Sequence, residues 1–370
     1  MKKILVYGLT AVKGGVESFL MNYYRNFDLT KVSVDFISNT EEAAYEDEVL
    51  ALGGNVYKVC SKRKNPFKFK KDLEEIFKET KYDVVWVNLC SLANIDYLKM
   101  AKKYGVENII VHSHNAGNMN GKLKEYFHNK NKKNIRKYAN HFWSCSKLAS
   151  EWFYDEDIIK SARFKVINNA IDTGEFDYNE EIRTKYRKEM DLENDLVLMN
   201  VGRFNIQKNH DFLIDVFNEV NKEVKNVKLL LVGVGELQEE IKNKVSSLGI
   251  SKNVIFLNSR DDVNSLMQAA DIFLMPSLFE GLPVSAVEAQ ASGIQCILSD
   301  RITDEIKITD LIKFVDIDKE KSVEKWKDKI ISIKNTELEN RSSKKLQVEN
   351  AGFEIKLEAK KLEKFFLNEI

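Results

Sequence analysis

Proline is scarce in this sequence, with 3 residues in 370, and no low-complexity tract interrupts the chain. Hydrophobic residues make up 44% of the chain and charged residues 31%. This balance is typical of a folded globular protein and excludes a disordered or collagen-like one. Because a single hydrophobic core stops growing at about 250 to 300 residues, we expect two domains.

Cysteine is also rare, and CxxC spacing is missing. Cys60, Cys90, Cys145 and Cys296 lie far apart, each in or beside an apolar run. We interpret them as reduced core residues of a cytoplasmic protein. No apolar run approaches the about 20 residues that a membrane-spanning helix needs. The opening MKKILVYGL is too short for a signal peptide and is expected to form a first strand and turn.

The chain has no net charge, but its charges are unevenly distributed. Residues 51–150 carry 20 Lys or Arg against 8 Asp or Glu, and the clusters 61–71 and 121–139 interleave these cations with Phe and Tyr. The clusters are either solvated helix faces and loops or a surface for an anionic membrane or a phosphorylated acceptor. No helix-turn-helix, zinc or RNA-recognition signature is present, so no nucleic-acid partner is expected.

Short β-branched and aromatic runs alternate with amphipathic segments along the whole chain. This pattern predicts an α/β fold of parallel sheets covered by helices on both faces. The predicted strands of the first half are 3–8, 32–38, 55–59, 83–88, 108–114, 141–146 and 165–170, and those of the second half are 196–204, 227–235, 253–258, 272–277, 296–300 and 312–316. The predicted helices are 16–27, 66–81, 95–105, 148–157, 211–224, 236–249, 262–270 and 283–292.

The pattern runs through two similar cycles, which predicts two doubly wound Rossmann-like domains facing each other across a cleft. Ligands are then expected at the carboxyl ends of the strands. We place the domains at 1–172 and 173–351, with the polar stretch 171–196 as the connection between them. The tail, 352–370, has the spacing of a helix. It is either a solvated terminal helix or one that packs back on the first domain.

The segment GRFNIQK follows a predicted strand, so Arg203 and Lys208 are expected at the carboxyl edge of the second sheet. There the planar fork of an arginine and the mobile charge of a lysine suit a diphosphate. The alternative is an ordinary loop with solvated side chains.

Glycines occupy the strand-to-helix turns that follow. Gly233 and Gly235 lie in VGVGEL, Gly202 begins GRF, and Gly15 lies in KGGVE of the first domain. Glycine lets the backbone approach a ligand, and the helix N-terminus behind it favours an anion. None of these turns is a full GxGxxG or P-loop, and tight turns explain them equally well.

The stretch SLFEGLPVSAVEAQASG places Glu280 before a helix and Glu288 about one and a half turns inside it. Pro283 is expected as the first helical residue. A carboxylate can accept two vicinal hydroxyls at once, so one glutamate suits a ribose and the other a hexose, with the N–H groups of Gly281, Leu282 and Val284 nearby. The alternative is a helix-entry acid and a solvated side chain.

In this order and at these separations, GGVE, GR with a lysine five positions on, GxG and FEGLPVSAVEA resemble the retaining glycosyltransferases of family 4, which have the GT-B fold. HSHN (112–115), SCSK (144–147) and INNAIDTGEF (167–176) also match segments of bacterial exopolysaccharide and capsule members. The resemblance covers nearly the whole chain. Departures are Ala170, where many relatives have glycine, and Val234, where aspartate is frequent.

The resemblance implies a role for each matching residue. Catalytic roles fall to Glu280 at the transferred sugar, to Arg203 and Lys208 at the donor diphosphate, and to His114, which reaches toward the donor sugar. Glu288 would bind the ribose, and the loop 257–262 around Arg260 would read the base through its backbone. The remaining donor-binding positions are Gly15, Gly202, Gly233, Gly235, Gly281, Leu282, Pro283 and Val284.

Neither the histidines nor the acidic pairs predict a metal site. His112 and His114 are expected to point to opposite faces of a strand and so to share no metal. Asp155 and Asp157, and likewise Asp316 and Asp318, have DxD spacing. The first pair lies in a charged helical tail and the second after a late strand, and we expect both to be solvated acids.

The predicted activity is transfer of a sugar, with retention of the anomeric configuration and without a metal or other cofactor. The expected donor is a nucleotide-diphosphate sugar, in particular a UDP-sugar. The expected acceptor is a glycan or an undecaprenyl-diphosphate-type lipid in exopolysaccharide or capsule synthesis. The protein is expected in the cytoplasm, with peripheral attachment to an anionic membrane through residues 51–150 left open. The alternatives are a nucleotide-sugar epimerase of the GT-B fold and a non-catalytic donor-binding subunit.

Overall fold

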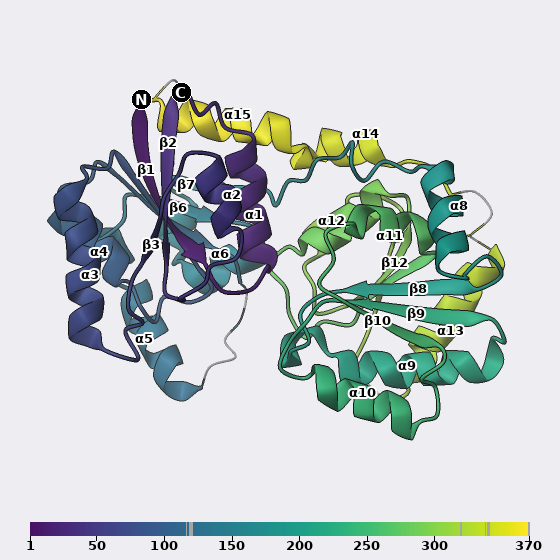
Figure 1. The fold of residues 1–370 in the computed structure, drawn as a ribbon. Helices are drawn as coiled ribbons and strands as arrows, with labels where there is room; N and C mark the ends of the chain where they lie inside the picture. Colours follow the sequence, from purple (N-terminus) through teal and green to yellow (C-terminus); the bar gives the residue numbers. More distant parts are fainter. Residues whose placement is uncertain (116, 118–120, 319, 337, 339–340, 369–370) are drawn as a thin grey trace. The chain divides into compact units, whose positions relative to one another are not determined.

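The computed structural model of the protein describes residues 1–115, 117, 121–318, 320–336, 338 and 341–368. The described chain divides into two compact units (Figure 1). Unit 1 comprises Met1–Ala170 and the C-terminal segment that begins at Ile355, and unit 2 comprises Ile171–Glu354. The chain therefore enters unit 2 at Ile171, two residues before the expected start at 173. It leaves unit 2 after Glu354, three residues beyond the expected end at 351.

The described part of unit 1 contains a seven-stranded parallel sheet in the order β3-β2-β1-β4-β5-β6-β7. All six residues of β4 are buried, as expected of a strand covered on both faces. The strands are β1 (Lys2–Leu9), β2 (Val32–Ser38), β3 (Val56–Lys58), β4 (Val84–Leu89), β5 (Asn108–Ser113), β6 (His141–Ser144) and β7 (Phe164–Val166).

The helices of unit 1 cover both faces of this sheet. Phe69 and Leu73 of α3 pack with Val85 and Val87 of β4 on one face, and Phe19 of α1 packs with the other face. The helices are α1 (Gly15–Arg25), α2 (Glu46–Ala51), α3 (Pro66–Glu79), α4 (Asp96–Lys103), α5 (Lys122–Lys132), η1 (Ile135–Lys137), α6 (Lys147–Phe153), α7 (Glu156–Ile159) and α15 (Ile355–Phe366).

The described part of unit 2 repeats the architecture with a six-stranded parallel sheet in the order β10-β9-β8-β11-β12-β13. Its strands are β8 (Leu196–Val201), β9 (Val227–Val232), β10 (Val254–Asn258), β11 (Ile272–Met275), β12 (Gln295–Ser299) and β13 (Ile312–Val315). Its helices are α8 (Glu180–Glu189), η2 (Ile206–Lys208), α9 (His210–Glu223), α10 (Gln238–Ser247), α11 (Val263–Ala269), α12 (Val284–Ala291), η3 (Asp304–Ile306), α13 (Ser322–Thr336), α14 (Lys345–Val348) and η4 (Glu349–Phe353). The predicted fold class of two Rossmann-like domains is confirmed.

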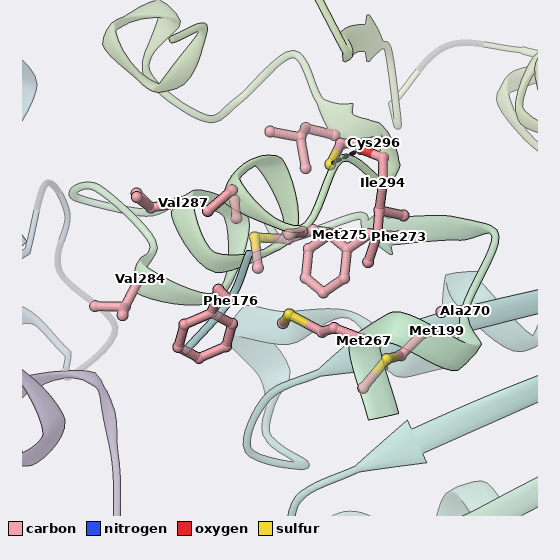
Figure 2. Close-up of a cluster of buried hydrophobic side chains, with 14 of the residues drawn as sticks. Phe176, Met199, Met267, Ala270, Phe273, Met275, Val284, Val287, Ile294 and Cys296 are labelled. Carbon is pink, nitrogen blue, oxygen red and sulfur yellow. Dashed lines mark hydrogen bonds between the residues drawn. The ribbon is translucent and has the colours of Figure 1, made fainter. Parts of the chain in front are cut away.

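Helix α12, which carries Glu288, is anchored by a buried cluster in unit 2. Figure 2 shows Val284 and Val287 of α12 in this cluster together with Phe273 and Met275 of β11. Complete burial of such a side chain contributes about 1.5 to 3 kcal/mol. Alanines occupy much of the rest of the helix, as expected of a helix that is buried nearly all round. The cluster therefore fixes the rotation of α12 and the direction of the Glu288 side chain.

Arg341 joins the ends of two helices in unit 2. Its guanidinium donates hydrogen bonds of 2.7–3.0 Å to the carbonyls of Met267, Gln268 and Ala270 at the end of α11, and to that of Ser292 after α12. It also lies 4.6 Å from the ring centre of Tyr178. Burial and the nearby charge of Arg183 lower the pKa of Arg341 to about 9.

The polar stretch 171–196 was expected to connect the domains, but the chain passes between the units directly before its first residue, and the stretch itself belongs to unit 2. It contains α8, which packs against α11, and Leu192, which is fully buried in the core of unit 2. Arg183 and Arg187 of α8 are held by Asp271, the residue before β11. The stretch looked like a linker because α8 is polar on most of its surface and is attached through ion pairs.

The C-terminal helix α15 belongs to unit 1. Ile355, Ala359, Leu362 and Phe366 join the core beside α1, and Figure 1 shows α15 in yellow along this unit. The ring centre of Phe366 lies 5.9 Å from that of Trp86 in β4. Of the two places left open for the tail, the helix takes the one on the first domain.

Candidate active site

The carboxyl edge of the unit 2 sheet is formed by the loops after β8, β9 and β11. The loop after β8 carries Gly202 and Arg203 and then forms the single turn η2, which ends at Lys208. The loop after β9 carries Gly233 and Gly235. The loop after β11 carries Glu280. Parallel strands bring these three loops to one edge, as the sequence predicted.

The glycines let these loops contact one another backbone to backbone. A Cβ atom on Gly233 would lie 2.1 Å from the carbonyl oxygen of Gly202, and one on Gly235 would lie 2.4 Å from that of Phe204. Phe204 N donates to Val234 O, and Leu237 N donates to Phe204 O. The glycines are thus required by the packing of the loops themselves, and their predicted contact with a phosphate remains a prediction.

Lys208 and Glu280 meet at this edge. The Lys208 ammonium lies 2.7 Å from Glu280 Oε1, and the two side chains are only 16% and 10% exposed. Gln207 Nε2 donates to Glu280 Oε2 at 3.2 Å. Glu280 is therefore a buried carboxylate with a cationic partner, and the alternative of a solvated helix-entry acid does not hold.

Arg203 lies at the same edge but is oriented differently. Its side chain is 52% exposed and forms an ion pair of 3.0 Å with Glu236, at the start of the segment that leads into α10. An exposed pair of this kind contributes little stability, so a ligand phosphate can displace the carboxylate at small cost.

Glu288 is partly buried on the second turn of α12. Burial, with a smaller effect of the negative charge of Glu175, raises the pKa of Glu288 to about 7. A carboxyl group that titrates near neutrality in a polar site is a frequent feature of functional sites. It can accept hydroxyl protons when ionised and donate one when protonated.

Pro283 was expected as the first helical residue, and this is wrong by one position. It has φ −74° and ψ 119°, outside the helical region, and is the cap residue before Val284. Gly281, Leu282 and Pro283 are buried in the turn between Glu280 and α12, and Val284 is buried as the first residue of α12. Proline fixes φ but leaves ψ free, so it suits either position.

Arg260 lies after β10 and is held by a neighbour. Its guanidinium donates to both oxygens of Asp262 at 2.8 and 2.6 Å, and Asp262 also accepts from Tyr186 Oη. These contacts join the loop around Arg260 to α8, which carries Tyr186. Its role in reading a base remains a prediction.

His114 and Gly15 belong to unit 1. His114 Nε2 lies 2.8 Å from Asn88 Oδ1, and burial lowers the pKa of His114 to about 3, so the ring is neutral. Gly15 is the first residue of α1, with no other atom within 4 Å of the place of a Cβ. The role of both residues at a donor remains a prediction.

The expectation that His112 and His114 point to opposite faces is wrong. Their ring centres lie 4.2 Å apart, because residues two positions apart on extended backbone share a face. His112 Nδ1 accepts from Trp86 Nε1, so this ring is part of the core of unit 1. Among residues that the structure describes, no group of three or more His, Cys, Asp or Glu is placed to hold a metal ion.

The acids with DxD spacing differ in their surroundings. Asp155 and Asp157 are exposed, as expected. Asp316 is not a solvated acid, because it accepts from Ser322 Oγ and pairs with Lys325 at 2.8 Å, and Asp318 pairs with Arg301. The contacts of Asp316 join the end of β13 to α13, whereas Asp318 is exposed, as expected, and its partner Arg301 follows β12.

The sequence analysis did not single out two side chains that contact loops next to predicted site residues, one in each unit. Gln207 contacts Glu280, and nothing in its position beside Lys208 distinguishes it from a solvated glutamine. Glu17 in unit 1 is only 5% exposed and accepts from the backbone N–H of Thr10, closing the loop that leads to Gly15. Its place in the GGVE segment was visible, but its burial was not.

Two doubly wound Rossmann-like units are the architecture of the GT-B class of glycosyltransferase fold. Residues 13–175 match the family described as Glycosyltransferase Family 4, and residues 182–350 match Glycosyl transferases group 1. The protein EpsF of Bacillus subtilis is 30% identical over 305 residues, which cover 80% of this chain and 78% of that protein. The chain belongs to glycosyltransferase family 4.

Other known proteins are similar over part of the sequence or in fold. A galactosyltransferase of Escherichia coli, which acts on a GlcNAc-diphosphoundecaprenol, is 33% identical over 110 residues, 29% of this chain and 28% of that protein. The Anabaena protein Alr3699/HepE, solved in complex with UDP-glucose, has a TM-score of 0.79 at 16% identity, with 100% of both chains covered. WaaG, a glycosyltransferase involved in lipopolysaccharide biosynthesis, has a TM-score of 0.70 at 15% identity, with 98% of this chain and 99% of that chain covered.

Proposed function

We propose that this protein transfers a sugar from a UDP-sugar to a glycan or lipid-linked acceptor in bacterial exopolysaccharide or capsule synthesis. The observation that carries the proposal is the Lys208–Glu280 pair at the carboxyl edge of unit 2, together with the titratable Glu288 on the second turn of α12, the helix that follows Glu280. Family membership, the UDP-glucose complex of the Anabaena relative and the lipid-linked substrate of the Escherichia coli relative support it.

In this proposal the donor diphosphate displaces the carboxylate partners of the two cations. Arg203 leaves Glu236, and Lys208 turns from Glu280 toward the phosphates. Glu288 accepts the ribose hydroxyls, while Glu280 accepts hydroxyls of the transferred sugar. As the bond between the anomeric carbon and the phosphate oxygen breaks, the two cations and the helix N-termini stabilise the charge that develops on the diphosphate.

The proposed stereochemical course is retention by attack on the same face. The acceptor oxygen bonds to the anomeric carbon as the phosphate oxygen leaves, and the acceptor proton passes to that phosphate oxygen. The step needs no enzymic nucleophile, in contrast to the double displacement of many glycosidases. In this proposal Arg203 and Lys208 stabilise the negative charge that develops on the leaving diphosphate, so the step requires no metal.

The experiment is incubation of the purified protein with UDP-, GDP- and ADP-sugars, with and without glycan and lipid-linked acceptors. We expect UDP release that depends on acceptor, a retained anomeric configuration by NMR, unchanged turnover in EDTA, and a strong loss in Glu280→Gln. A glycosyl adduct detected by mass spectrometry would overturn same-face attack. Donor isomerisation without acceptor indicates an epimerase, and donor binding without any turnover indicates a binding subunit.

We also propose that unit 1 meets an anionic membrane through α3 and α5. Leu123 and Tyr126 on α5 are 71% and 60% exposed, and Phe67 at the start of α3 is 87% exposed. Asn65 caps α3 by accepting from the N–H groups of Phe67 and Lys68, which fixes the backbone that carries the exposed ring. Exposed apolar side chains among lysines combine insertion with attraction to anionic lipid, about 1 kcal/mol per cation. No helix of the described residues is long and apolar enough to span a membrane.

The membrane proposal is tested by reversing the charge of exposed lysines on α5. Lys122→Glu with Lys124→Glu and Lys130→Glu is expected to reduce binding to vesicles that contain phosphatidylglycerol by at least tenfold, on the order of 1 kcal/mol per charge. Lys132 is left unchanged, because it donates to the carbonyls of Glu151 and Trp152 within the fold. The control variant reverses the charge of Lys225, an exposed lysine of unit 2. Equal binding by both variants would remove the proposal.

A further inference from the structure

The turn η2 and Asn209, the residue that follows it, are joined to the loop after β11 by hydrogen bonds. Leu278 N donates to Gln207 O at 2.8 Å, and Asn209 Nδ2 donates to Pro276 O at 3.2 Å. The side chain of Gln207 adds two bonds, from Nε2 to Phe279 O at 3.0 Å and to Glu280 Oε2 at 3.2 Å. The position of Glu280 therefore depends on this turn, although 73 residues separate Gln207 from it.

The two partners of the Glu280 carboxylate hold it in different ways. Lys208 lies 2.7 Å from Oε1, but its ammonium is not aligned for a hydrogen bond to that atom. Gln207 provides an aligned hydrogen bond to the other oxygen. Hydrogen bonds weaken steeply away from alignment, whereas attraction between two charges depends mainly on distance. Gln207 therefore fixes the orientation of the carboxylate, and Lys208 balances its charge.

The amide of Gln207 is suited to this task because both of its contacts are acceptors. A glutamine nitrogen carries two hydrogens, and here one faces the Phe279 carbonyl and the other faces Glu280. The amide has no charge, so an arriving diphosphate attracts it far less than it attracts Lys208. The Phe279 carbonyl holds the amide in place when the lysine turns away.

We propose that Gln207 is a positioning residue that keeps the Glu280 carboxylate in its productive orientation after Lys208 has turned to the donor diphosphate. This role rests on the proposed function, in which Glu280 contacts the transferred sugar. A misplacement of about 1 Å at a reacting centre can cost on the order of a hundredfold in rate. Loss of the amide is therefore expected to affect turnover, while binding of the nucleotide part, which does not involve Glu280, remains.

The test is Gln207→Met, which nearly keeps the shape of the side chain and removes both donors, with Gln207→Glu measured in parallel. We expect kcat to fall about ten- to a hundredfold, with the KM for the UDP-sugar and the Kd for UDP within about twofold of wild type. Gln347→Met, at an exposed position of α14, is the matched control and should leave both constants unchanged. Unchanged kcat in both Gln207 variants, or equal changes in kcat and UDP affinity, would overturn the role.

A double-variant comparison shows whether Gln207 acts through Glu280. Glu280→Asp shortens the side chain by one methylene and withdraws its carboxylate from the amide. Adding Gln207→Met to this variant should cause little further loss, because the interaction is already absent. A full additional loss would overturn the role while leaving the proposed function intact. Absence of sugar transfer by the wild-type protein, or full activity of Glu280→Asp, would instead overturn the proposed function and this role with it.

Discussion

The pKa of Glu288 near 7 predicts that UDP binding depends on pH in the neutral range. Burial raises this pKa from the usual value near 4.5, since the ionised form loses solvation. The ionised carboxylate is the form that accepts two ribose hydroxyls. Below pH 7 the group must therefore lose a proton when the nucleotide binds, and above pH 7 it has already lost it. Affinity is expected to fall as the pH is lowered.

The size of the effect follows from the fraction of Glu288 that is ionised. With a pKa of about 7, that fraction falls from about nine-tenths at pH 8 to about one-tenth at pH 6, so the affinity contributed by this group falls about tenfold. The same raised pKa means that ionisation of Glu288 destabilises the folded protein increasingly as the pH rises from about 4.5 to about 7.

Isothermal titration with UDP at pH 6, 7 and 8 provides the measurement, with Glu288→Gln as the reference. The phosphate of UDP also titrates, but it does so equally for both proteins, so the ratio of their affinities isolates the carboxyl group. We expect this ratio to change about tenfold over the range and about one proton to be released on binding at pH 6. A ratio independent of pH would refute the assignment of Glu288 to the ribose.

Two further predictions concern stability. Arg341→Leu removes four hydrogen bonds to helix-end carbonyls and should lower the free energy of unfolding by about 2 to 4 kcal/mol. Urea titration of the full chain measures this loss, and we expect Arg341→Lys to be intermediate; a loss below about 0.5 kcal/mol for Arg341→Leu would contradict the capping role. Gly235→Ala places a Cβ 2.4 Å from Phe204 O and should cost about 1 to 3 kcal/mol and weaken UDP binding, whereas Gly249→Ala, with open space around it, should leave UDP binding unchanged. Equal UDP binding by the two glycine variants would show that the loop contact does not shape the site.

The alternation of strands and helices was readable from the sequence because each element has its own local period. The predicted strands 196–204 and 272–277 correspond to β8 and β11, which begin where expected and end three and two residues earlier. Parallel strands must place their carboxyl ends at one edge, so the location of Lys208 and Glu280 at the same edge followed from topology. The two-unit fold and the edge that carries these two residues were thus determined by the sequence, whereas their ion pair was not.

Contacts between distant segments were decided only by the tertiary structure. The amphipathic pattern of α15 fits any apolar surface, and only the packed core shows that it lies beside α1. The stretch around α8 looked like a linker because its attachment through Asp271 is ionic and distant in sequence. The contact of Gln207 with Glu280 and the raised pKa of Glu288 depend on burial and on side-chain geometry. Neither quantity has a local signature, because both arise from atoms that the folded chain brings together.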